Sequence, residues 1–528
     1  AGRVRREEYV RVKPDGTSAT EATGYDYDLE GRVTRQGVMV LTGGGWSRKG
    51  AGIDTAAMKY NAFGEVSERG LAHYDATTGV ETLSYAEKFE YDNAGRIVRT
   101  NSGDGAWKYF MYDGAGNQTL MIQSVGADLN AAGGVDTLAE VLALWTGGTS
   151  TIATADAAGV VATITRYDAR NQAVEVREPQ RRLTAATVSD LVTTRAYTAF
   201  GDVAYEINAL NARVDYTYNT MGRLIKVESP AVSITSEAGV VTNNYRPTEH
   251  RYYDASGRLV AQRDANGNLT KYTLLAGSGY NGAQALIAET FTPDNQVTRT
   301  KYDIMGDARR IENPLYNAAT APQHVRVQSF DKMGRLVQVT QEGGLVQYYA
   351  YDGLGQRIKY ANSFYNSTQS GNAYYNASFN AANHATWNNA ESTAYDQQGR
   401  ITQVIAMGGD ATTYAYGWDS NIATTGMGTF GGWTQTTTYA NGRSGTEKTD
   451  LFGRQVQTVN LGAQTTNFSY DKAGRLTARS ATHVVNNVVT ALGTTLNQAY
   501  FNTGRLKEIH SAGFVEDGPV NGGMVNNY

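Results

Sequence analysis

Residues 251–274 read RYYDASGRLVAQRDANGNLTKYTL, and this stretch decides the fold. Its two turns, 254–257 and 264–267, each begin with Asp and end with Gly. An Asp carboxylate can accept hydrogen bonds from backbone N–H groups two residues further on, and Gly can take the positive φ that reverses the chain. The runs that follow, 258–263 and 268–274, have the length and composition of β-strands. The stretch therefore predicts strands joined by tight turns.

The first of these turns belongs to a repeated motif. The motif is an aromatic residue, Asp or Asn, any two residues, Gly, Arg and an aliphatic residue, and seven near-complete copies are too many for chance. An Asp that recurs this often is explained by turn geometry rather than by membership of one active site. The predicted structural turn residues are Tyr27, Asp28, Gly31, Arg32, Tyr91, Asp92, Gly95, Arg96, Tyr218, Gly222, Arg223, Tyr253, Asp254, Gly257, Arg258, Phe330, Asp331, Gly334, Arg335, Tyr395, Asp396, Gly399, Arg400, Tyr470, Asp471, Gly474 and Arg475.

Incomplete copies fill the gaps between the seven. In one of them Asn171 stands where Gly is expected, and Asn is the other residue that tolerates the left-handed backbone region. Three successive pairs of copies are 21 residues apart, which suits two strands of about eight residues and two turns. Because Tyr ends one strand and Arg opens the next, we expect rings and guanidinium groups to stack between adjacent hairpins while Arg pairs with Asp.

The composition is that of a thin sheet rather than of a solid globule. The 528 residues include 58 Gly and 35 Tyr but only 8 Pro, and the hydrophobic fraction is 41%. Tyr can bury its ring and keep its hydroxyl in water, so a sheet with wet faces needs few aliphatic residues. Strand twist makes a long strip of hairpins spiral. We predict an all-β fold: repeated β-hairpins in a long spiralling strip that forms a hollow shell or cocoon, with short helical insertions.

The repeats run from about residue 27 to 510, so we expect one continuous repeat segment over 1–528. Insertions are predicted at 126–164 and 362–393, and apolar residues at 3–4 spacing predict a short helix at 135–145 within the first. That helix is too short to span a bilayer. The chain starts without Met and without an apolar leader, so it is expected to be a fragment of a longer protein or a processed product.

Charge and motif content argue against several functions. With 47 basic and 51 acidic residues, the chain lacks the basic excess of nucleic-acid-binding or anionic-membrane-binding proteins. It has no Cys, and its six His residues are widely separated in sequence, so no local zinc motif exists. The stretch nearest to a serine nucleophile elbow, 442–445, is incomplete. No catalytic residue, metal or cofactor is predicted, and this segment is not expected to be an enzyme.

The repeats from Tyr27 to Leu506 resemble the YD repeats of rearrangement-hotspot (Rhs) proteins, of the B and C components of insecticidal toxin complexes, and of teneurins. The resemblance implies a spiralling β-strip that closes a hollow shell. In bacterial members the shell encloses a toxic C-terminal polypeptide, which implies a secreted or extracellular protein. The bacterial pattern usually ends in an Asp-Pro-x-Gly-like signature beside a self-cleavage site. Here none of the eight prolines follows an Asp, so no self-cleavage residue is carried over.

Two functions remain as hypotheses, and they differ in partner. The first is a toxin shell whose partners are a C-terminal toxin cargo and a secretion-system or cell-surface component. The alternative is a cell-surface adhesion protein that binds carbohydrate through Tyr374, Tyr375, Trp387 and Asn388, although the same residues suit simple loop packing. An enzyme built on a β-propeller is disfavoured, because propeller blades repeat at roughly 40–45 residues and these repeats are irregularly spaced.

Overall fold

The computed structural model describes residues 2–43, 45–48, 54–75, 78–124, 160–182, 188–277, 280, 286–362, 387, 390–424, 428–485, 488–500, 506–511, 513–515, 518–520 and 525–527. Over these residues the chain is almost entirely β-strand, and η1 (Glu342–Gly344) is a single turn of 3-10 helix. The predicted all-β fold is confirmed. The helix predicted at 135–145 lies outside the described residues, as do most of the two predicted insertions.

The strands before residue 125 are β1 (Arg6–Val12), β2 (Ser18–Tyr27), β3 (Val33–Thr42), β4 (Gly45–Ser47), β5 (Asp54–Tyr60), β6 (Val66–Asp75), β7 (Val80–Tyr91), β8 (Ile97–Thr100), β9 (Lys108–Tyr112) and β10 (Gln118–Ser124). The strands between residues 160 and 362 are β11 (Val160–Tyr167), β12 (Ala173–Arg182), β13 (Val188–Tyr197), β14 (Val203–Ile207), β15 (Arg213–Tyr218), β16 (Leu224–Glu228), β17 (Val232–Thr235), β18 (Val241–Tyr245), β19 (Thr248–Tyr253), β20 (Leu259–Arg263), β21 (Leu269–Ala276), β22 (Leu286–Phe291), β23 (Val297–Tyr302), β24 (Ala308–Glu312), β25 (Val325–Phe330), β26 (Leu336–Thr340), β27 (Val346–Tyr351) and β28 (Arg357–Asn362). The remaining strands are β29 (Glu391–Tyr395), β30 (Ile401–Ile405), β31 (Ala411–Asp419), β32 (Ala423–Thr424), β33 (Gly428–Thr429), β34 (Gly432–Thr438), β35 (Ser444–Asp450), β36 (Gln455–Val459), β37 (Thr465–Tyr470), β38 (Leu476–Val485), β39 (Val488–Tyr500), β40 (Leu506–Ser511), β41 (Gly513–Val515), β42 (Gly518–Val520) and β43 (Val525–Asn527).

The main sheet is an antiparallel meander in which nearly every strand pairs with the next one along the chain. The exceptions are β3–β5, β16–β19, β31–β34 and β40–β43, where short strands between the partners are skipped. Three small hairpins, β17–β18, β32–β33 and β41–β42, form separate two-stranded sheets. Because successive strands cross the strip in opposite directions, the turns alternate between its two rims. The repeated motif turns fall on every second connection, so they all lie on one rim, which we call the motif rim. The connections between them lie on the opposite rim.

The two rims differ in their strand register. On the motif rim, Tyr252 pairs with Ala261 but Tyr253 pairs with Leu259, so one extra residue forms a β-bulge opposite the motif aromatic residue. The same shift occurs at the other motif hairpins, for example opposite Tyr91 and Phe330. The hairpin between β20 and β21, which turns on the opposite rim, has a continuous register without a bulge. A few opposite-rim hairpins, such as β6–β7 and β12–β13, also contain a register shift, but the motif rim repeats it at every motif hairpin. Bulges bend strands and increase their twist, so their regular recurrence on one rim favours bending of the strip in one direction.

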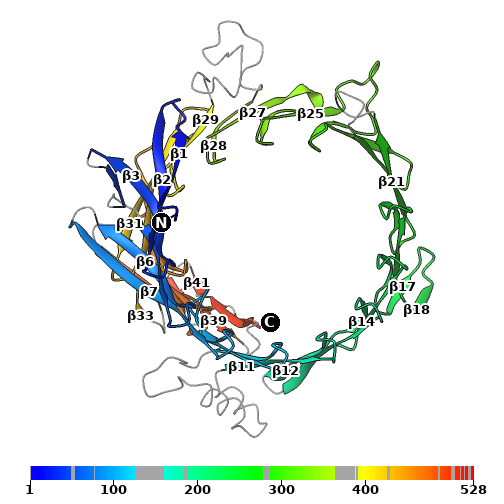
Figure 1. Ribbon diagram of the computed structural model, residues 1–528, viewed down its shortest axis with the longest axis horizontal. Coiled ribbons are helices and arrows are strands. Elements are labelled where there is room, and N and C mark those ends of the chain that lie inside the picture. The colour runs from blue at the N-terminus through cyan, green and yellow to red at the C-terminus, as the bar shows by residue number, and fades with distance from the viewer. Residues whose placement is uncertain are drawn as a thin grey trace.

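The strip winds into a ring around a central space that no described strand crosses (Figure 1). We call β1–β26 the first coil and β27–β43 the second coil. On one side of the ring the strands of the second coil, such as β29 and β31, lie beside β1–β7, whereas the far side, around β14 to β21, is one strip thick (Figure 1). The end strands β1 and β43 do not pair with each other, so the sheet is a spiral and not a closed barrel.

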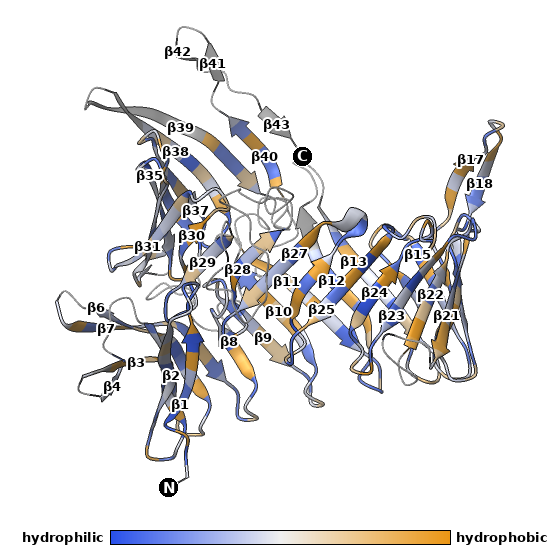
Figure 2. Cartoon of the chain, turned by 90° about the horizontal axis from the view of Figure 1, so that it is seen from above, coloured by the Kyte–Doolittle hydropathy of each residue, from blue (hydrophilic) through white to orange (hydrophobic). Residues whose placement is uncertain are grey.

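Side chains are buried mainly where the two coils overlap. From residue 188 to 277, Gly257 is the one residue with described burial that is classed as buried, so this part of the sheet is exposed to water on both faces. Hydrophobic and hydrophilic residues are mixed along the strands (Figure 2). A buried cluster appears where the coils meet, and β1 contributes Val12 to it. The cluster consists of Ala350, Ile358, Ala361, Trp387 and Ala390. The thin sheet expected from composition is therefore what the chain forms.

Candidate functional site

The repeated turn is held by a fixed set of hydrogen bonds around its acidic residue. At Asp92, Oδ1 accepts hydrogen bonds from the backbone N–H groups of Ala94 at 2.9 Å and Arg96 at 3.0 Å. The other oxygen, Oδ2, accepts from Nε of Arg96 at 2.7 Å. Gly95 has a φ of +77°, as the turn requires. Asp331, Asp396 and Asp471 make the same bonds, so the turn fixes its Arg side chain in one orientation.

Each fixed Arg reaches the next repeat. The Arg96 guanidinium lies over the Tyr112 ring, 4.7 Å from its centroid, and its Nη1 donates to the Asp113 carbonyl at 3.2 Å. In return the Tyr112 hydroxyl donates to the Ile97 carbonyl at 2.7 Å. This reciprocal contact joins neighbouring repeats. Its Arg-over-ring contact recurs at Arg32–Tyr60, Arg223–Tyr253, Arg335–Tyr351, Arg400–Tyr416, Arg454–Tyr470 and Arg475–Tyr500.

Two other copies of the repeat, one near-complete and one incomplete, keep the turn with Asn in place of Asp or of Gly. Asn219 accepts backbone hydrogen bonds through Oδ1 at 3.0 Å, as Asp does, but has no carboxylate for Arg223. Asn171 adopts a φ of +62° in the position that Gly holds elsewhere, as the sequence indicated. At Asn219 an amide oxygen thus caps the turn in place of a carboxylate oxygen. At Asn171 the side chain of Asn is tolerated in the left-handed conformation that Gly adopts in the other turns.

One repeat escaped the sequence motif because Thr449 replaces the aromatic residue before Asp450. The Asp450 side chain is 0% exposed and that of Arg454 is 11% exposed, and Nε of Arg454 donates to Oδ2 of Asp450 at 2.7 Å. The spacing of Asp450, Gly453 and Arg454 alone would have revealed this turn. It is the most buried of the Asp–Arg turn pairs among the described residues.

The coils meet along a line that we call the coil seam, where the opposite rim of the first coil lies against the motif rim of the second. Arg11 of β1 donates through Nη1 to Oε1 of Gln356 at 3.0 Å and to the Asp396 carbonyl at 2.7 Å. Its Nε donates to Glu21 at 2.9 Å, and both side chains of this ion pair are about 95% buried. Arg11 therefore ties the first coil to two motif turns of the second.

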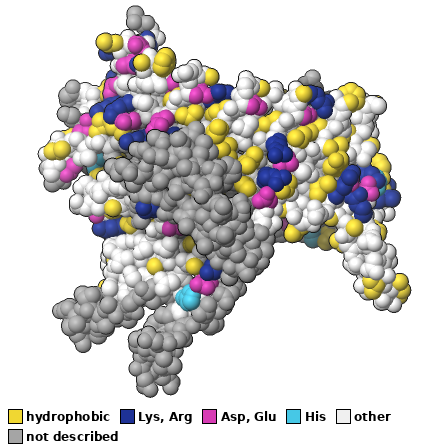
Figure 3. All heavy atoms as spheres, turned by 90° about the horizontal axis from the view of Figure 1, so that it is seen from below, with side chains coloured by type: hydrophobic (Ala, Val, Ile, Leu, Met, Phe, Trp, Pro, Cys, Tyr) yellow, Lys and Arg dark blue, Asp and Glu magenta, His cyan; other side chains and the backbone are white. Residues whose placement is uncertain are grey.

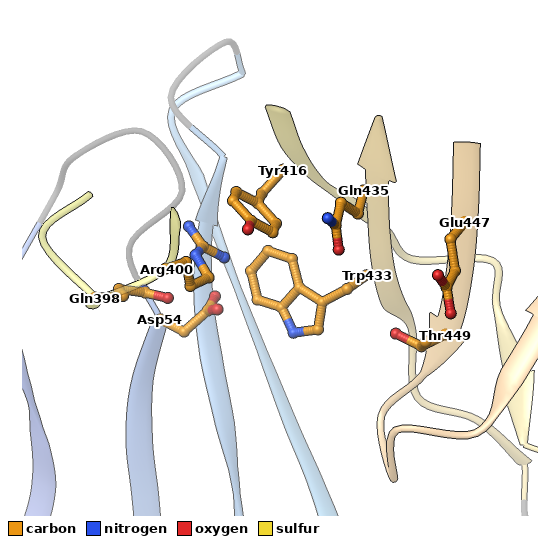
Figure 4. Close-up of a pocket in the computed structure, with 8 residues that line it drawn as sticks. All are labelled: Asp54, Gln398, Arg400, Tyr416, Trp433, Gln435, Glu447 and Thr449. Carbon is orange, nitrogen blue, oxygen red and sulfur yellow. The ribbon is translucent and has the colours of Figure 1, made fainter. Parts of the chain in front are cut away.

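Further along the seam, aromatic residues of the second coil cover a hydrogen-bonded His–Asp pair of the first. Nδ1 of His73 lies 2.8 Å from Asp54, and the His73 ring stacks on Trp418 with centroids 5.1 Å apart. The Trp433 ring meets both the His73 and the Trp418 ring edge-on. Burial raises the pKa of the Asp54 carboxyl, against the lowering effect of its His73 hydrogen bond. Figure 4 shows Asp54 beside Arg400 and Trp433 at this point.

The chain is similar in fold to chains of Tc toxin complexes. It aligns over 97% of its length with 30% of a chain in the crystal structure of TcdB2-TccC3-TEV, at 13% sequence identity and a TM-score of 0.44. It aligns over 95% of its length with 30% of a chain in the Tc holotoxin pore of Photorhabdus luminescens, at 14% identity and a TM-score of 0.34. It thus spans about a third of these chains.

The sequence comparisons add no relative. No protein-family model matches the chain. No curated protein matches it either.

The residues proposed for carbohydrate binding at 374–388 are mostly outside the described residues, namely Tyr374, Tyr375 and Asn388. Trp387 is described, and it is 4% exposed. Its ring packs edge-on against Tyr348 with centroids 6.2 Å apart, within the cluster that Val12 contacts. For Trp387 the geometry fits the packing role and leaves no ring face open to a sugar.

The described surface carries no concentrated charge of one sign on the face shown in Figure 3, where acidic and basic side chains are interspersed. Within the described ranges, no group of three His, Asp or Glu residues is placed to hold a metal ion. In the same part of the chain, no helix is both long and apolar enough to cross a membrane.

The turn carboxylates predict acid sensitivity. Hydrogen bonds from the Arg96 side chain and backbone lower the pKa of Asp92, and those from Arg258 lower the pKa of Asp254. A group with a lowered folded pKa stabilises the fold above its unfolded pKa of about 3.9 and loses that effect as pH falls further. We expect the thermal unfolding midpoint to be steady near neutral pH and to fall below about pH 4. Circular dichroism melts between pH 7 and pH 2.5 measure it.

The variant Asp92→Asn is the control for this pH dependence. Asn keeps the backbone caps, as Asn219 does, but cannot titrate. Its midpoint should drop less between pH 4 and pH 2.5 than that of the unchanged chain. Equal drops would show that the turn carboxylates do not set the acid sensitivity.

The substitution Gly257→Val tests the backbone conformation of the turn. Gly257 has a φ of +76°, and a β-branched residue there is strained by about 1–3 kcal/mol. An added Cβ would also meet the Arg223 guanidinium, which can move aside. The neighbouring Ser256→Ala should change stability by less than about 0.5 kcal/mol. Urea unfolding midpoints compare the two variants, and similar shifts would contradict the assigned turn.

Proposed function

We propose that this chain is a segment of the wall of an Rhs-type shell that encloses a toxic polypeptide before delivery. The observation that carries the proposal is the coil seam, because a strip whose second coil lies on its first builds a continuous wall around a central space (Figure 1). The seam is held by buried polar contacts of Arg11, which join residues more than 340 positions apart. A strip that stayed open would not need them.

The role of the wall is steric in this proposal, and the segment has no catalytic step of its own. The repeated carboxylates are engaged in caps and ion pairs with Arg, so turn geometry accounts for them. The wall is one strip thick over β14 to β21 and has mixed polar and apolar side chains on its strands (Figure 2). An unfolded chain gains less from such a mixed surface than from a continuous apolar one. A secreted location and a secretion-system or cell-surface partner belong to the same proposal.

Electron cryo-microscopy of the natural product that contains residues 1–528 tests this proposal. We expect a closed β-wall with weak, unstructured density inside it. A β-structure whose interior is filled by its own folded core, or a strip with no enclosed volume, would overturn the shell proposal.

Protease protection adds a functional test on the same product. Sequences outside the wall should be digested while any enclosed polypeptide persists. The variant Arg11→Met weakens the coil seam and should expose the enclosed polypeptide to the protease. As a matched control, Arg6→Met removes an exposed Arg of the same strand, whose Glu8 partner is also exposed, and should leave protection unchanged. Equal digestion in all three proteins would contradict a protective role.

A further inference from the structure

A cavity of about 250 Å³ opens at the coil seam, beside the hydrogen-bonded side chains of Asp54 and His73. Its walls come from both coils. Asp54 belongs to the first coil, and the second coil supplies Gln398 and Arg400 from a motif turn together with side chains of β31, β34 and β35. Figure 4 shows Asp54, Gln398 and Arg400 on one side, Gln435, Glu447 and Thr449 on the other, and Trp433 and Tyr416 between them.

Strand register builds the floor of this cavity. Tyr416 pairs with Gln435, and Gln435 pairs with Glu447, so these three side chains form one row across adjacent strands. Two residues along, Trp433 pairs with Thr449 on the same face of the sheet. The floor therefore sets aromatic rings directly beside a carboxamide, a carboxylate and a hydroxyl.

Several polar groups of the cavity are not used by the fold. Nε2 of Gln398 is buried and makes no hydrogen bond of good geometry. It lies near enough to Asp54 to lower the pKa of that carboxyl. The side chains of Gln435 and Thr449 make no hydrogen bond to other described residues. Buried polar groups are normally satisfied, so an unsatisfied amide that faces a cavity calls for a partner.

We propose that this seam cavity is a binding site for a small neutral sugar, one pyranose ring in size. Amide and hydroxyl groups can donate to sugar oxygens, carboxylates can accept from sugar hydroxyls, and aromatic rings can contact the C–H surface of the ring. The cavity volume is below the range of about 300–1,000 Å³ that is usual for drug-sized ligands, so it has room for one sugar ring rather than for several.

The charges of the cavity favour an uncharged ligand. Asp54 and Glu447 both line it, and Arg400 is already bonded to Asp396 at 2.7 Å and lies over the rings of Tyr416 and Trp433. A sugar carboxylate would meet two acidic side chains without a free cation. The site differs from the 374–388 segment proposed from sequence, and it is independent of what the shell encloses.

Because the cavity is lined by both coils, bound sugar should stabilise their contact. A ligand that binds the folded chain and not the unfolded chain raises the unfolding midpoint. Titration of the 528-residue chain with glucose, galactose and N-acetylglucosamine, followed by tryptophan fluorescence and by thermal unfolding, tests this. We expect saturable binding of at least one of them at millimolar concentration, with a raised midpoint, and no binding of glucuronate.

The variant Gln435→Ala should weaken this binding roughly tenfold, the effect of losing one or two hydrogen bonds. Gln328→Ala removes a similar, partly buried amide from β25, away from the seam, and should leave binding unchanged. Circular dichroism confirms that both variants are folded. Absence of saturable binding by every neutral sugar, tighter binding of glucuronate, or equal affinity in the two variants would overturn the proposal.

Discussion

Replacing Arg11 by Met is expected to lower the free energy of unfolding by about 3–5 kcal/mol, the usual cost of breaking a buried ion pair. The substitution leaves the Glu21 carboxylate, whose side chain is 6% exposed, without its cation. Burial already raises the pKa of Glu21, so the isolated carboxylate would take up a proton or draw in water. The variant also loses the hydrogen bonds to Gln356 and to the Asp396 carbonyl across the coil seam.

Two controls separate these causes. In Arg11→Met with Glu21→Leu, both charges are replaced by apolar groups, and most of the lost stability should return because no buried charge is left unpaired. The part of the unfolding free energy that the double variant does not regain measures the hydrogen bonds across the seam. Arg6→Met breaks an ion pair whose two side chains are 39% and 46% exposed, and it should cost less than about 1 kcal/mol. Urea unfolding followed by circular dichroism measures all three, and a small effect of Arg11→Met would contradict the importance of the seam.

The substitution Asp450→Ala should cost about 3–5 kcal/mol as well, since Arg454 would stay largely buried without its carboxylate. The change also removes the acceptor of two backbone hydrogen bonds, from Phe452 at 3.0 Å and from Arg454 at 2.9 Å. This is the turn that the aromatic motif missed, yet we expect it to be the most sensitive of the motif turns in the described chain.

The matched control is Asp254→Ala, which removes the same side chain from the same kind of turn. Its partner Arg258 is 58% exposed, so the unpaired guanidinium would be solvated. We expect a loss of only about 1 kcal/mol, most of it from the lost cap. Thermal and urea unfolding of the two variants should differ clearly. Equal losses would mean that burial at the coil seam does not set the strength of the turn.

The sequence predicted most of what is local. Asp92, Gly95 and Arg96 lie within five residues, so the hydrogen bonds among them follow from spacing and from the preferences of Asp and Gly alone. The stacking of Arg on the Tyr of the next repeat was also expected, because neighbouring hairpins of a meander are close in sequence and in space. The low aliphatic content correctly indicated a thin sheet.

The sequence did not show which turns would be buried. Phe63 and Phe200 hold the third position of motif turns on the free rim of the first coil and are 90% and 91% exposed. Phe452 holds the same position in a turn of the second coil and is partly buried. The three turns have the same local pattern. Their difference in burial therefore depends on where each turn lies in the wound strip and not on the turn sequence.

The candidate sugar site was beyond sequence reasoning for the same reason. Asp54 lies more than 340 residues before Gln398 and Arg400, and the turns that supply these residues look like ordinary repeats. Aromatic and amide residues are dense in sequence at 374–388, and this density indicated that segment instead.

The sequence by itself thus determined the turns, the strand order and the thin spiralling strip, because each of these depends on contacts between residues a few positions apart. Only the tertiary structure decided where the second coil meets the first, and with it the Arg11 contacts, the buried Asp450 turn and the seam cavity. The position of that meeting depends on small bends and twists added along the many strands of the first coil, which together wind the strip into the ring of Figure 1. No single residue determines the total bend and twist of the strip, so the place where the coils meet cannot be inferred from any one repeat.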